Sequence, residues 1–192
     1  MPEIEAPIRL TAYDPRWPRL FEQEQEALQR VLIPWLAGPI EHIGSTAVPG
    51  LTAKPVIDIM AAVATLEKSK SAIPALRELD YLYAPYRPDV MHWFCKPRLS
   101  FRTHHLHLVP WGSPLWISRI AFRDRLRADS GLAAEYMELK RSLAASFEYD
   151  REAYTEGKSD FVARVVAEAL RTNATKCSLR PLRPSVKSGS KF

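Results

Sequence analysis

The chain has 192 residues, of which 46% are hydrophobic and 26% charged, a composition that fits an ordinary globular domain and excludes a collagen-like or fully disordered chain. No stretch approaches the roughly 18 consecutive apolar residues of a membrane helix. The formal net charge is +5, but residues 172–192 hold five basic side chains and no acidic ones, so residues 1–171 sum to zero. A neutral body argues against nucleic acid as a partner, because a basic tail alone offers only salt-sensitive attraction.

Cysteine usage and the first residues of the chain predict a cytoplasmic protein. Cys95 and Cys177 lie in very different sequence surroundings, so we expect a reducing compartment and no disulfide framework. The opening residues Met1-Pro-Glu-Ile-Glu-Ala6 are acidic where a signal peptide requires basic residues, and no apolar stretch follows them. We therefore expect no membrane association.

The first part of the chain predicts a helix, two strands and a second helix. Apolar residues recur at three- and four-residue steps over residues 17–36, which indicates an amphipathic helix. Short apolar runs at 39–43 and 56–63 indicate buried strands on either side of a loop rich in glycine and proline. Residues 66–79 predict a helix that Pro74 must kink or restart.

The remainder of the chain predicts strands followed by helices. Beyond Trp111 the pattern is helical as far as Thr172. Strands toward the front with helices before and after them indicate an α+β domain with a helical C-terminal part, which we place in residues 1–172. Residues 173–192, rich in Ser, Arg, Lys and Pro, predict a disordered basic tail. The three further strands are expected at 81–84, 91–96 and 104–109.

The most informative segment runs from Glu41 through Gly44-Ser45 to Asp58. Gly44-Ser45 follows a strand and supplies backbone N–H groups and a hydroxyl, which are groups that commonly hold phosphate, although most Gly-Ser pairs are simple turns. Asp58 lies within an apolar strand, where burial of a carboxylate costs several kcal/mol unless it is paired or binds a metal. Lys54 lies between them and could approach the same anion, or it could be a solvated loop lysine.

Two histidines on a later strand are candidate partners of Asp58. His105 and His107 project on one face of that strand, with His104 on the other. Such a pair can share a metal ion, or act as acid or base, or be hydrogen-bonded structural histidines. If this strand neighbours that of Asp58, the three side chains converge; Glu41 is a further candidate, but the sequence does not decide whether it or His42 faces the core.

Basic residues in the helical part are candidates for binding phosphate. Arg119, Arg123 and Arg127 recur at every fourth residue and so share one helix face, which suits a phosphate-rich ligand. The alternative is a solvated face paired with neighbouring aspartates. Lys158 lies one turn before Phe161 on an otherwise apolar helix, and is either a ligand-binding residue or a lysine whose stem covers apolar surface.

These motifs, taken together, resemble the GrpB family of small bacterial proteins, itself similar to the nucleotidyltransferase superfamily. The resemblance covers residues 8–171 and implies a polymerase-β-like nucleotidyltransferase fold, in which a mixed β-sheet is flanked by helices. It rests on Tyr13-Asp-Pro-Arg-Trp17, Glu41-His-Ile-Gly-Ser-Thr-Ala-Val-Pro-Gly-Leu51, Lys54-Pro-Val-Ile-Asp58-Ile59, His105-Leu-His107, Phe122-Arg-Asp-Arg-Leu126, Tyr136-Met-Glu-Leu-Lys140 and Tyr154-x-x-x-Lys158.

The resemblance implies a role for each candidate residue. Gly44, Ser45, Lys54, Arg123 and Lys158 would bind the phosphates of a nucleoside triphosphate or a phosphorylated small molecule. A divalent cation, Mg²⁺ or Mn²⁺ or alternatively Zn²⁺, would be held by the acidic and imidazole groups, and a nucleotidyl or phosphoryl group would pass to a small acceptor. The usual second strand carboxylate is replaced by Met60. The metal and catalytic residues would be Asp58 and His107, with His105 and Glu41 as further metal ligands.

Two other functions remain open at this level. A non-catalytic nucleotide-binding module would keep the phosphate-binding groups without the chemistry. An accessory or folding domain is implied by the similar domain that is fused to dephospho-CoA kinase in some bacteria.

Overall fold

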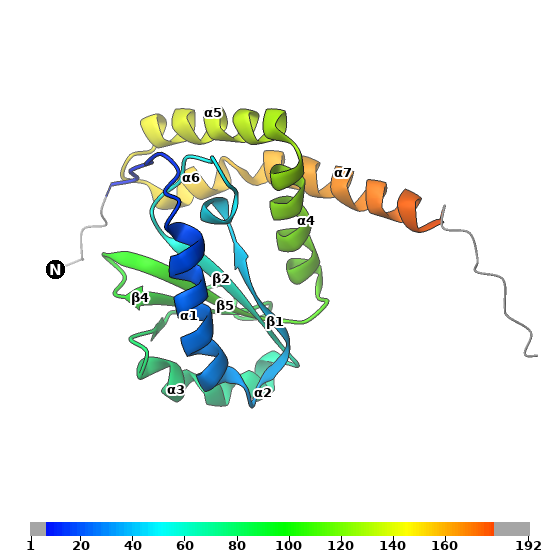
Figure 1. Ribbon diagram of the computed structural model, residues 1–192. Helices are drawn as coiled ribbons and strands as arrows, with labels where there is room; N and C mark the ends of the chain where they lie inside the picture. The colour runs from blue at the N-terminus through cyan, green and yellow to red at the C-terminus, as the bar shows by residue number, and fades with distance from the viewer. Residues whose placement is uncertain (1–6, 179–192) are drawn as a thin grey trace, which may run out of the picture.

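The computed structural model describes residues 7–178, which form a five-stranded mixed sheet with helices on both faces (Figure 1). The strand order is β1-β2-β5-β4-β3. The central pair, β2 and β5, is parallel, whereas the other neighbouring strands are antiparallel. The strands are β1 (Leu36–Ile43), β2 (Ile57–Val63), β3 (Leu82–Tyr83), β4 (His92–Pro97) and β5 (Arg102–Pro110).

The register of the two central strands decides which side chains share a face. Asp58 is paired with His105 and Met60 with His107. Residues directly opposite each other project to the same side, so these four side chains lie on one face of the sheet. The antiparallel pairing of β1 adds Glu41, opposite Met60, to that face, and places His42 on the other.

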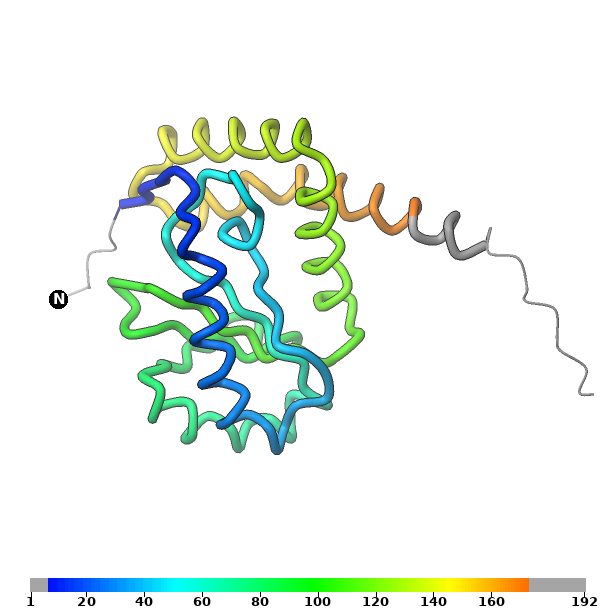
Figure 2. The backbone as a smooth tube through the Cα atoms, in the orientation of Figure 1, coloured from blue at the N-terminus to red at the C-terminus, as the bar shows by residue number. Residues whose placement is uncertain are grey.

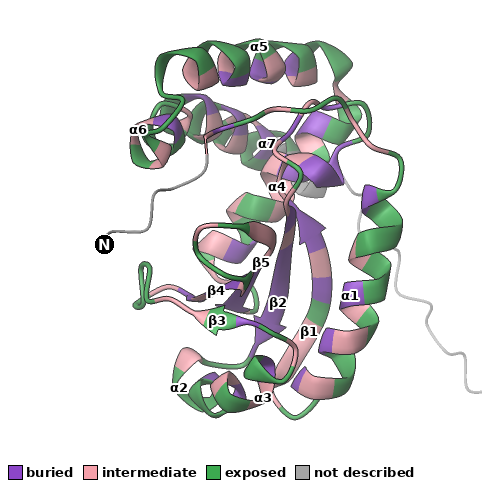
Figure 3. Ribbon diagram, turned by 90° about the vertical axis from the view of Figure 1, so that its left-hand side faces the viewer, coloured by how far each residue is buried: buried purple, intermediate pink, exposed green. Residues whose placement is uncertain are grey.

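Helices from the two halves of the chain cover opposite faces. Side chains of α1, α2 and α3 pack on the face that carries His42, whereas Trp116 of α4 packs with Met60 and Met91 on the face that carries Asp58. Figure 1 shows α5, α6 and α7 gathered beyond one end of the sheet, and Figure 3 shows buried strands between the helices. The helices are α1 (Trp17–Leu32), α2 (Leu66–Ser69), α3 (Ile73–Arg77), α4 (Pro114–Ala128), α5 (Ser130–Ser146), α6 (Arg151–Glu156) and α7 (Ser159–Ser178).

A separate apolar cluster joins the loop after β1 to the helical end of the molecule. Val48 and Leu51 of this loop pack with Leu126, Tyr136 and Phe161. The chain trace in Figure 2 passes from the first described residues alongside the same loop, where Thr11 and Ala53 exchange backbone hydrogen bonds of 2.9 and 3.0 Å. The loop is therefore held from two sides.

The predicted α+β class and five strands are confirmed, with two differences at element ends. The expected helix over 17–36 ends at Leu32, because Pro34 lacks the N–H group that would continue it, and Leu36 begins β1. The division at Pro74 is confirmed, since α3 begins at Ile73 with this proline in its first turn. Residues 173–178 continue α7 instead of starting the expected tail, and the rest of that tail lies outside the described residues. No helix in the described range is long and apolar enough to cross a membrane.

Two buried histidines should make the stability of this fold sensitive to acid. Burial lowers the pKa of His42 to about 4 and that of His107 to about 3, both from an ordinary value of 6.5. Between these values the unfolded chain binds more protons than the folded one, so stability falls as the pH drops below about 6.5. We expect the free energy of unfolding, measured in urea from pH 7 to pH 4, to fall by up to about 2.7 kcal/mol per pH unit.

The variant His107→Gln removes one of these proton-binding groups, so we expect roughly half of the slope. An unchanged slope in this variant would show that other groups cause the acid sensitivity.

Candidate functional site

The predicted meeting of Asp58 with a histidine of the later strand is confirmed for His105. The Nδ1 atom of His105 lies 2.8 Å from Oδ1 of Asp58. Because a carboxylate oxygen accepts, Nδ1 carries the proton that donates this hydrogen bond. The Nε2 atom is buried and has no hydrogen-bond partner among the described residues. The geometry therefore fixes one ring nitrogen and leaves the other for a ligand or a proton.

Asp58 is ionised in this setting. Burial alone would raise its pKa, but the hydrogen bond from His105, with the positive charge of Arg119, outweighs burial and holds the pKa below its usual range. The side chain of Asp58 is 30% exposed, and that of His105 is 15% exposed. Asp58 is thus an anchored negative charge that solvent still reaches.

Gly44 allows the turn after β1 to approach Asp58. Its φ of 71° and ψ of −170° fall in a region that is essentially limited to glycine. A Cβ atom at this position would lie 2.4 Å from Oδ2 of Asp58. The glycine therefore serves both the backbone conformation and the close contact, and it brings Ser45 next to the strand of Asp58.

His107 and Glu41 share a face with Asp58, but their side chains have other partners. His107 is 8% exposed, and its Nδ1 lies 3.3 Å from the sulfur of Met91. The Glu41 carboxylate lies 2.6 Å from the guanidinium of Arg123. Strand register alone predicts four convergent groups, whereas the side-chain contacts join only Asp58 and His105.

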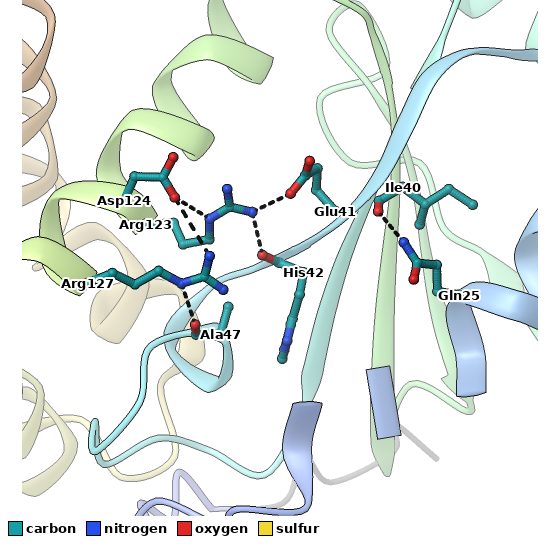
Figure 4. Close-up of polar contacts among 8 residues, drawn as sticks. All are labelled: Gln25, Ile40, Glu41, His42, Ala47, Arg123, Asp124 and Arg127. Atoms are coloured by element: carbon teal, nitrogen blue, oxygen red, sulfur yellow. Dashed lines mark hydrogen bonds and ion pairs between the residues drawn. The ribbon is translucent and has the colours of Figure 1, made fainter. Parts of the chain in front are cut away.

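Arg123 connects α4 to β1 through a buried set of polar contacts, shown in Figure 4. It is 7% exposed; it binds Glu41 at 2.6 Å, the carbonyl of His42 at 2.9 Å and Asp124 at 2.7 Å. Arg127 donates to the carbonyl of Ala47 at 2.8 Å. These two members of the predicted arginine stripe hold the chain on either side of the Gly44–Ser45 turn, and their nearest partners are protein groups.

A second set of basic residues lies around Asp58. Nζ of Lys158 lies 4.1 Å from the ring centre of Tyr154, and Nζ of Lys54 lies 5.0 Å from the same ring. Burial, followed by the charge of Lys54, lowers the pKa of Lys158 to about 7. Arg119 is exposed on α4 and acts electrostatically on both Asp58 and Lys158.

Lys140 completes this set and was not among the predicted site residues. It is 2% exposed; its Nζ lies 3.1 Å from Oγ of Ser45 and donates to the carbonyl oxygen of Thr52. Its Nζ also lies 5.0 Å from the ring centre of Tyr136. The sequence held a signal for it, because a lysine four residues after Tyr136 interrupts an apolar helix stripe.

Lys54, Arg119, Lys140 and Lys158, which lie near the Gly44–Ser45 turn, are called the basic cluster below. Arg119 and Lys158 act electrostatically on Asp58, and Lys140 contacts Ser45. The basic side chains Arg119, Lys140 and Lys158 outnumber the carboxylate of Asp58, so the balance favours an anionic ligand.

The side chains near Asp58 show whether the expected divalent cation could be bound there. Among the described residues, no three His, Cys, Asp or Glu side chains come together as a metal-binding group. Glu41 is bound to Arg123, and Met60 stands in place of a second strand carboxylate. A two-carboxylate magnesium site does not fit these residues. One cation held by Asp58 and by the phosphate oxygens of a nucleotide does fit, since Mg²⁺ is commonly bound in this way.

A well-formed groove in the described part of the chain does not include Asp58, His105 or any member of the basic cluster. Its volume is about 860 Å³, and it follows the outer edge of β1 between α1, α4 and α5. Glu41, Arg123 and Arg127 line it. The predicted site residues are therefore divided between this groove and the basic cluster, with the loop after β1 between them.

Comparisons with known proteins agree on the family. A family model described as GrpB protein matches residues 7–168. A UPF0157 protein of Pseudomonas aeruginosa is 39% identical over 168 residues, covering 85% of this chain and 68% of its own. A crystal structure of the conserved protein GrpB from Enterococcus faecalis has a TM-score of 0.78 and 31% identity, covering 86% of this chain and 99% of that one. A dephospho-CoA kinase of Mycolicibacterium paratuberculosis is 29% identical over 180 residues, covering 80% of this chain but 44% of the kinase.

The buried contacts of Arg123 predict a large loss of stability when it is replaced. Arg123→Met leaves the Glu41 carboxylate and the His42 carbonyl without their partner, and we expect about 3 kcal/mol less unfolding free energy in urea. Arg125→Met on the same helix is the matched control: its ion pair with Asp129 is over one-third exposed, so we expect a loss below about 1 kcal/mol. Equal losses would contradict a structural role specific to Arg123.

The contact between Gly44 and Asp58 gives a second stability prediction. Gly44→Ala places a methyl group against Oδ2 of Asp58 in a conformation that alanine rarely adopts, and we expect a loss of about 3 kcal/mol or more. Gly50→Ala is the control, because Gly50 also has a positive φ, of 77°, but no atom lies within 4 Å of its added Cβ. There we expect only about 1 kcal/mol from the backbone term. Urea denaturation of both variants measures the difference, and similar losses would exclude a role for the Asp58 contact.

Proposed function

Because the chain belongs to the GrpB protein family, we propose that it is a nucleotidyltransferase-fold protein that moves a nucleotidyl or phosphoryl group from a nucleoside triphosphate to a small acceptor. The observation that carries this proposal is the basic cluster around Asp58 at the Gly44–Ser45 turn. A phosphate chain is a ligand whose charge suits a group of basic side chains, two of which have pKa values lowered by burial.

The unusual pKa values of two lysines support an anionic ligand. Burial and the neighbouring Lys158 lower the pKa of Lys140 to about 7, and burial with Lys54 does the same to Lys158. Like charges repel one another while the cluster has no ligand, so both lysines are partly deprotonated near neutral pH. A bound phosphate chain would favour the charged form of Lys158, and its binding would be coupled to proton uptake by this lysine.

The Asp58–His105 pair supplies a general base. Asp58 orients the ring of His105 through Nδ1, and Nε2 would take the proton of an acceptor hydroxyl when a bound acceptor reaches this buried atom. Phosphoryl transfer needs little more from the protein than positioned charges and an oriented nucleophile. When a divalent cation is bound with the nucleotide, Asp58 would hold it, and the cation would neutralise charge on the phosphates.

The order of motifs supports the proposed fold assignment. A strand leads to Gly44-Ser45, and the next strand begins with a carboxylate against that turn. This is the arrangement in which nucleotidyltransferases present a nucleotide. Met60 in place of the second carboxylate makes this site different from the two-metal form, and leaves imidazole and lysine nitrogens to act as bases.

A second candidate is an accessory domain without chemistry of its own. The similarity to part of a dephospho-CoA kinase favours it, because the matched 180 residues leave more than half of that protein for another domain. On this reading the basic cluster would bind a nucleotide or phosphorylated metabolite without turnover, or would serve only to hold the loop.

Binding of ATP and pyrophosphate tests the proposal. We expect calorimetry at pH 7 to show binding that weakens with salt, and proton uptake detectable as a dependence of the enthalpy on the ionisation heat of the buffer. Lys158→Met and Arg119→Met should each weaken binding about tenfold, equivalent to about 1.4 kcal/mol. Asp58→Ala should remove any increase in affinity that Mg²⁺ or Mn²⁺ gives.

Arg125→Met is the matched control for charge, since it removes one cation from the same helix outside the cluster. Unchanged affinity in the Lys158 and Arg119 variants would reject the basic cluster as the binding site. Binding by the unaltered protein without transfer of label from radioactive ATP to any of a panel of hydroxyl and amine acceptors would favour the accessory domain.

A further inference from the structure

The Gly44–Ser45 turn contains a pair of groups that phosphate binding alone does not use. Oγ of Ser45 and Nζ of Lys140 lie 3.1 Å apart, although 95 residues separate them in the sequence. A hydroxyl in contact with a buried amine is the arrangement in which lysine activates a serine nucleophile.

The surroundings of Lys140 favour its neutral form. It is 2% exposed, and no carboxylate pairs with it among the described residues. The groups facing it are the Ser45 hydroxyl and the Thr52 carbonyl from the loop, Tyr136 and Arg141 from its own helix, and Lys158 from the start of α7. Two of these groups are cations and none is an anion. Burial and the charges of Lys158 and Arg141 lower the pKa of Lys140 to about 7.

The hydrogen bonds around Nζ suit a neutral amine as a proton acceptor. A neutral amine has two N–H groups and one lone pair. One N–H group donates to the carbonyl oxygen of Thr52, which can only accept, and this bond orients the amine. The lone pair can then receive the proton of the Ser45 hydroxyl. Lys54 and Lys158 instead lie over the ring of Tyr154, and an aromatic ring face offers these lysines no hydroxyl proton to accept.

We propose that Ser45 is a nucleophile activated by Lys140, and that the transferred group is bonded to Ser45 Oγ before it passes to the acceptor. This inference rests on the proposed function, because it assigns a covalent route to the same transfer. It also gives the chemistry a base at the Gly-Ser turn, where the sheet lacks a second carboxylate to assist a metal ion.

The first step balances as a displacement at phosphorus. Oγ of Ser45 attacks the α-phosphorus of a nucleoside triphosphate, the Oγ–P bond forms, and the bond to the bridging oxygen of pyrophosphate breaks. The electron pair leaves with pyrophosphate, and the serine proton passes to Nζ of Lys140. Cations of the basic cluster would neutralise the charge of the departing pyrophosphate.

The second step reverses these roles. An acceptor hydroxyl attacks the same phosphorus and the Oγ–P bond breaks. Lys140 returns its proton to Ser45, while His105 Nε2 takes the proton of the acceptor. Pyrophosphate and the nucleotidylated acceptor are the two products, and no oxidant or reductant is required.

A fluorophosphonate probe tests the nucleophile without a known substrate. It reacts by forming an Oγ–P bond with loss of fluoride, and intact-mass spectrometry with peptide mapping locates the product. We expect a single label on Ser45. Its rate should rise about tenfold per pH unit below pH 7 and level off above it, as deprotonation of Lys140 requires.

Single substitutions test the roles of Ser45 and Lys140 in this labelling separately. Ser45→Ala should abolish the label, whereas Ser142→Ala, at an exposed serine of α5, should leave it unchanged. Lys140→Met should slow labelling about 100-fold, and Lys68→Met, at an exposed lysine of α2, should not. Thermal unfolding of each variant checks that it is folded. Because Ser45→Ala removes one atom from a partly exposed side chain, it decides the result even if the Lys140 variant fails to fold.

Incubation of the unaltered protein with ATP and Mg²⁺ tests the route itself. We expect one nucleotidyl group on Ser45, removed on addition of a competent acceptor or by excess pyrophosphate. Binding of ATP with no label on Ser45 from either reagent would overturn the covalent route and leave the proposed function standing. Labelling by the fluorophosphonate together with no affinity for ATP or pyrophosphate would contradict the proposed function and support only a serine nucleophile. Equal labelling of Ser45 with Lys140→Met would overturn the role of the lysine.

Discussion

The parallel pairing of β2 with β5 is the constraint on which the site depends. It sets Asp58 opposite His105, although 47 residues separate them, and the 2.8 Å hydrogen bond follows from that register. A shift of one residue would turn His105 to the opposite face and place His104 or Leu106 beside the carboxylate. Parallel strands need a long crossover connection, and the one between β2 and β5 contains α2, α3, β3 and β4. The same connection therefore supplies the other strands on that side of the sheet.

Basic residues near the turn after β1 serve two distinct purposes. Arg123 and Arg127 are bound to Glu41, to Asp124 and to backbone carbonyls, so their charge is largely used within the protein. The residues of the basic cluster instead lie close enough to repel one another, and this repulsion adds to burial in lowering the pKa of Lys158. The first group makes the turn rigid and the second leaves it electropositive. A rigid turn with surplus positive charge is what an anion site needs, because the cost of ordering it is met when the chain folds.

The positions of the helices and strands are predictable from the sequence more fully than the contacts between their side chains. Hydrophobic periodicity and the Gly/Pro loop predicted the strands around Asp58, and the i, i+2 spacing of His105 and His107 predicted their shared face. Which imidazole reaches Asp58 depends on register and on the depth of burial, and neither is encoded in local spacing: His107, further along β5, meets the sulfur of Met91 instead. The helix over residues 17–36 was placed too long because its apolar spacing continued past Pro34. Lys140 was overlooked because its partners, Ser45 and Thr52, lie in a loop about 90 residues away.

The nitrogen bases near the turn offer an explanation for the absence of a second carboxylate on β2. A carboxylate pair would make the centre anionic and would require metal ions before a phosphate could approach. Here one carboxylate is hydrogen-bonded to a histidine and interacts with Lys158 and Arg119, so phosphate can be attracted by side chains alone. Burial, followed by the charge of Lys158, lowers the pKa of Lys140 to about 7 and gives it a lone pair near neutral pH. Attraction of the anion and activation of Ser45 thus have a common electrostatic cause, and a change that strengthens one alters the other.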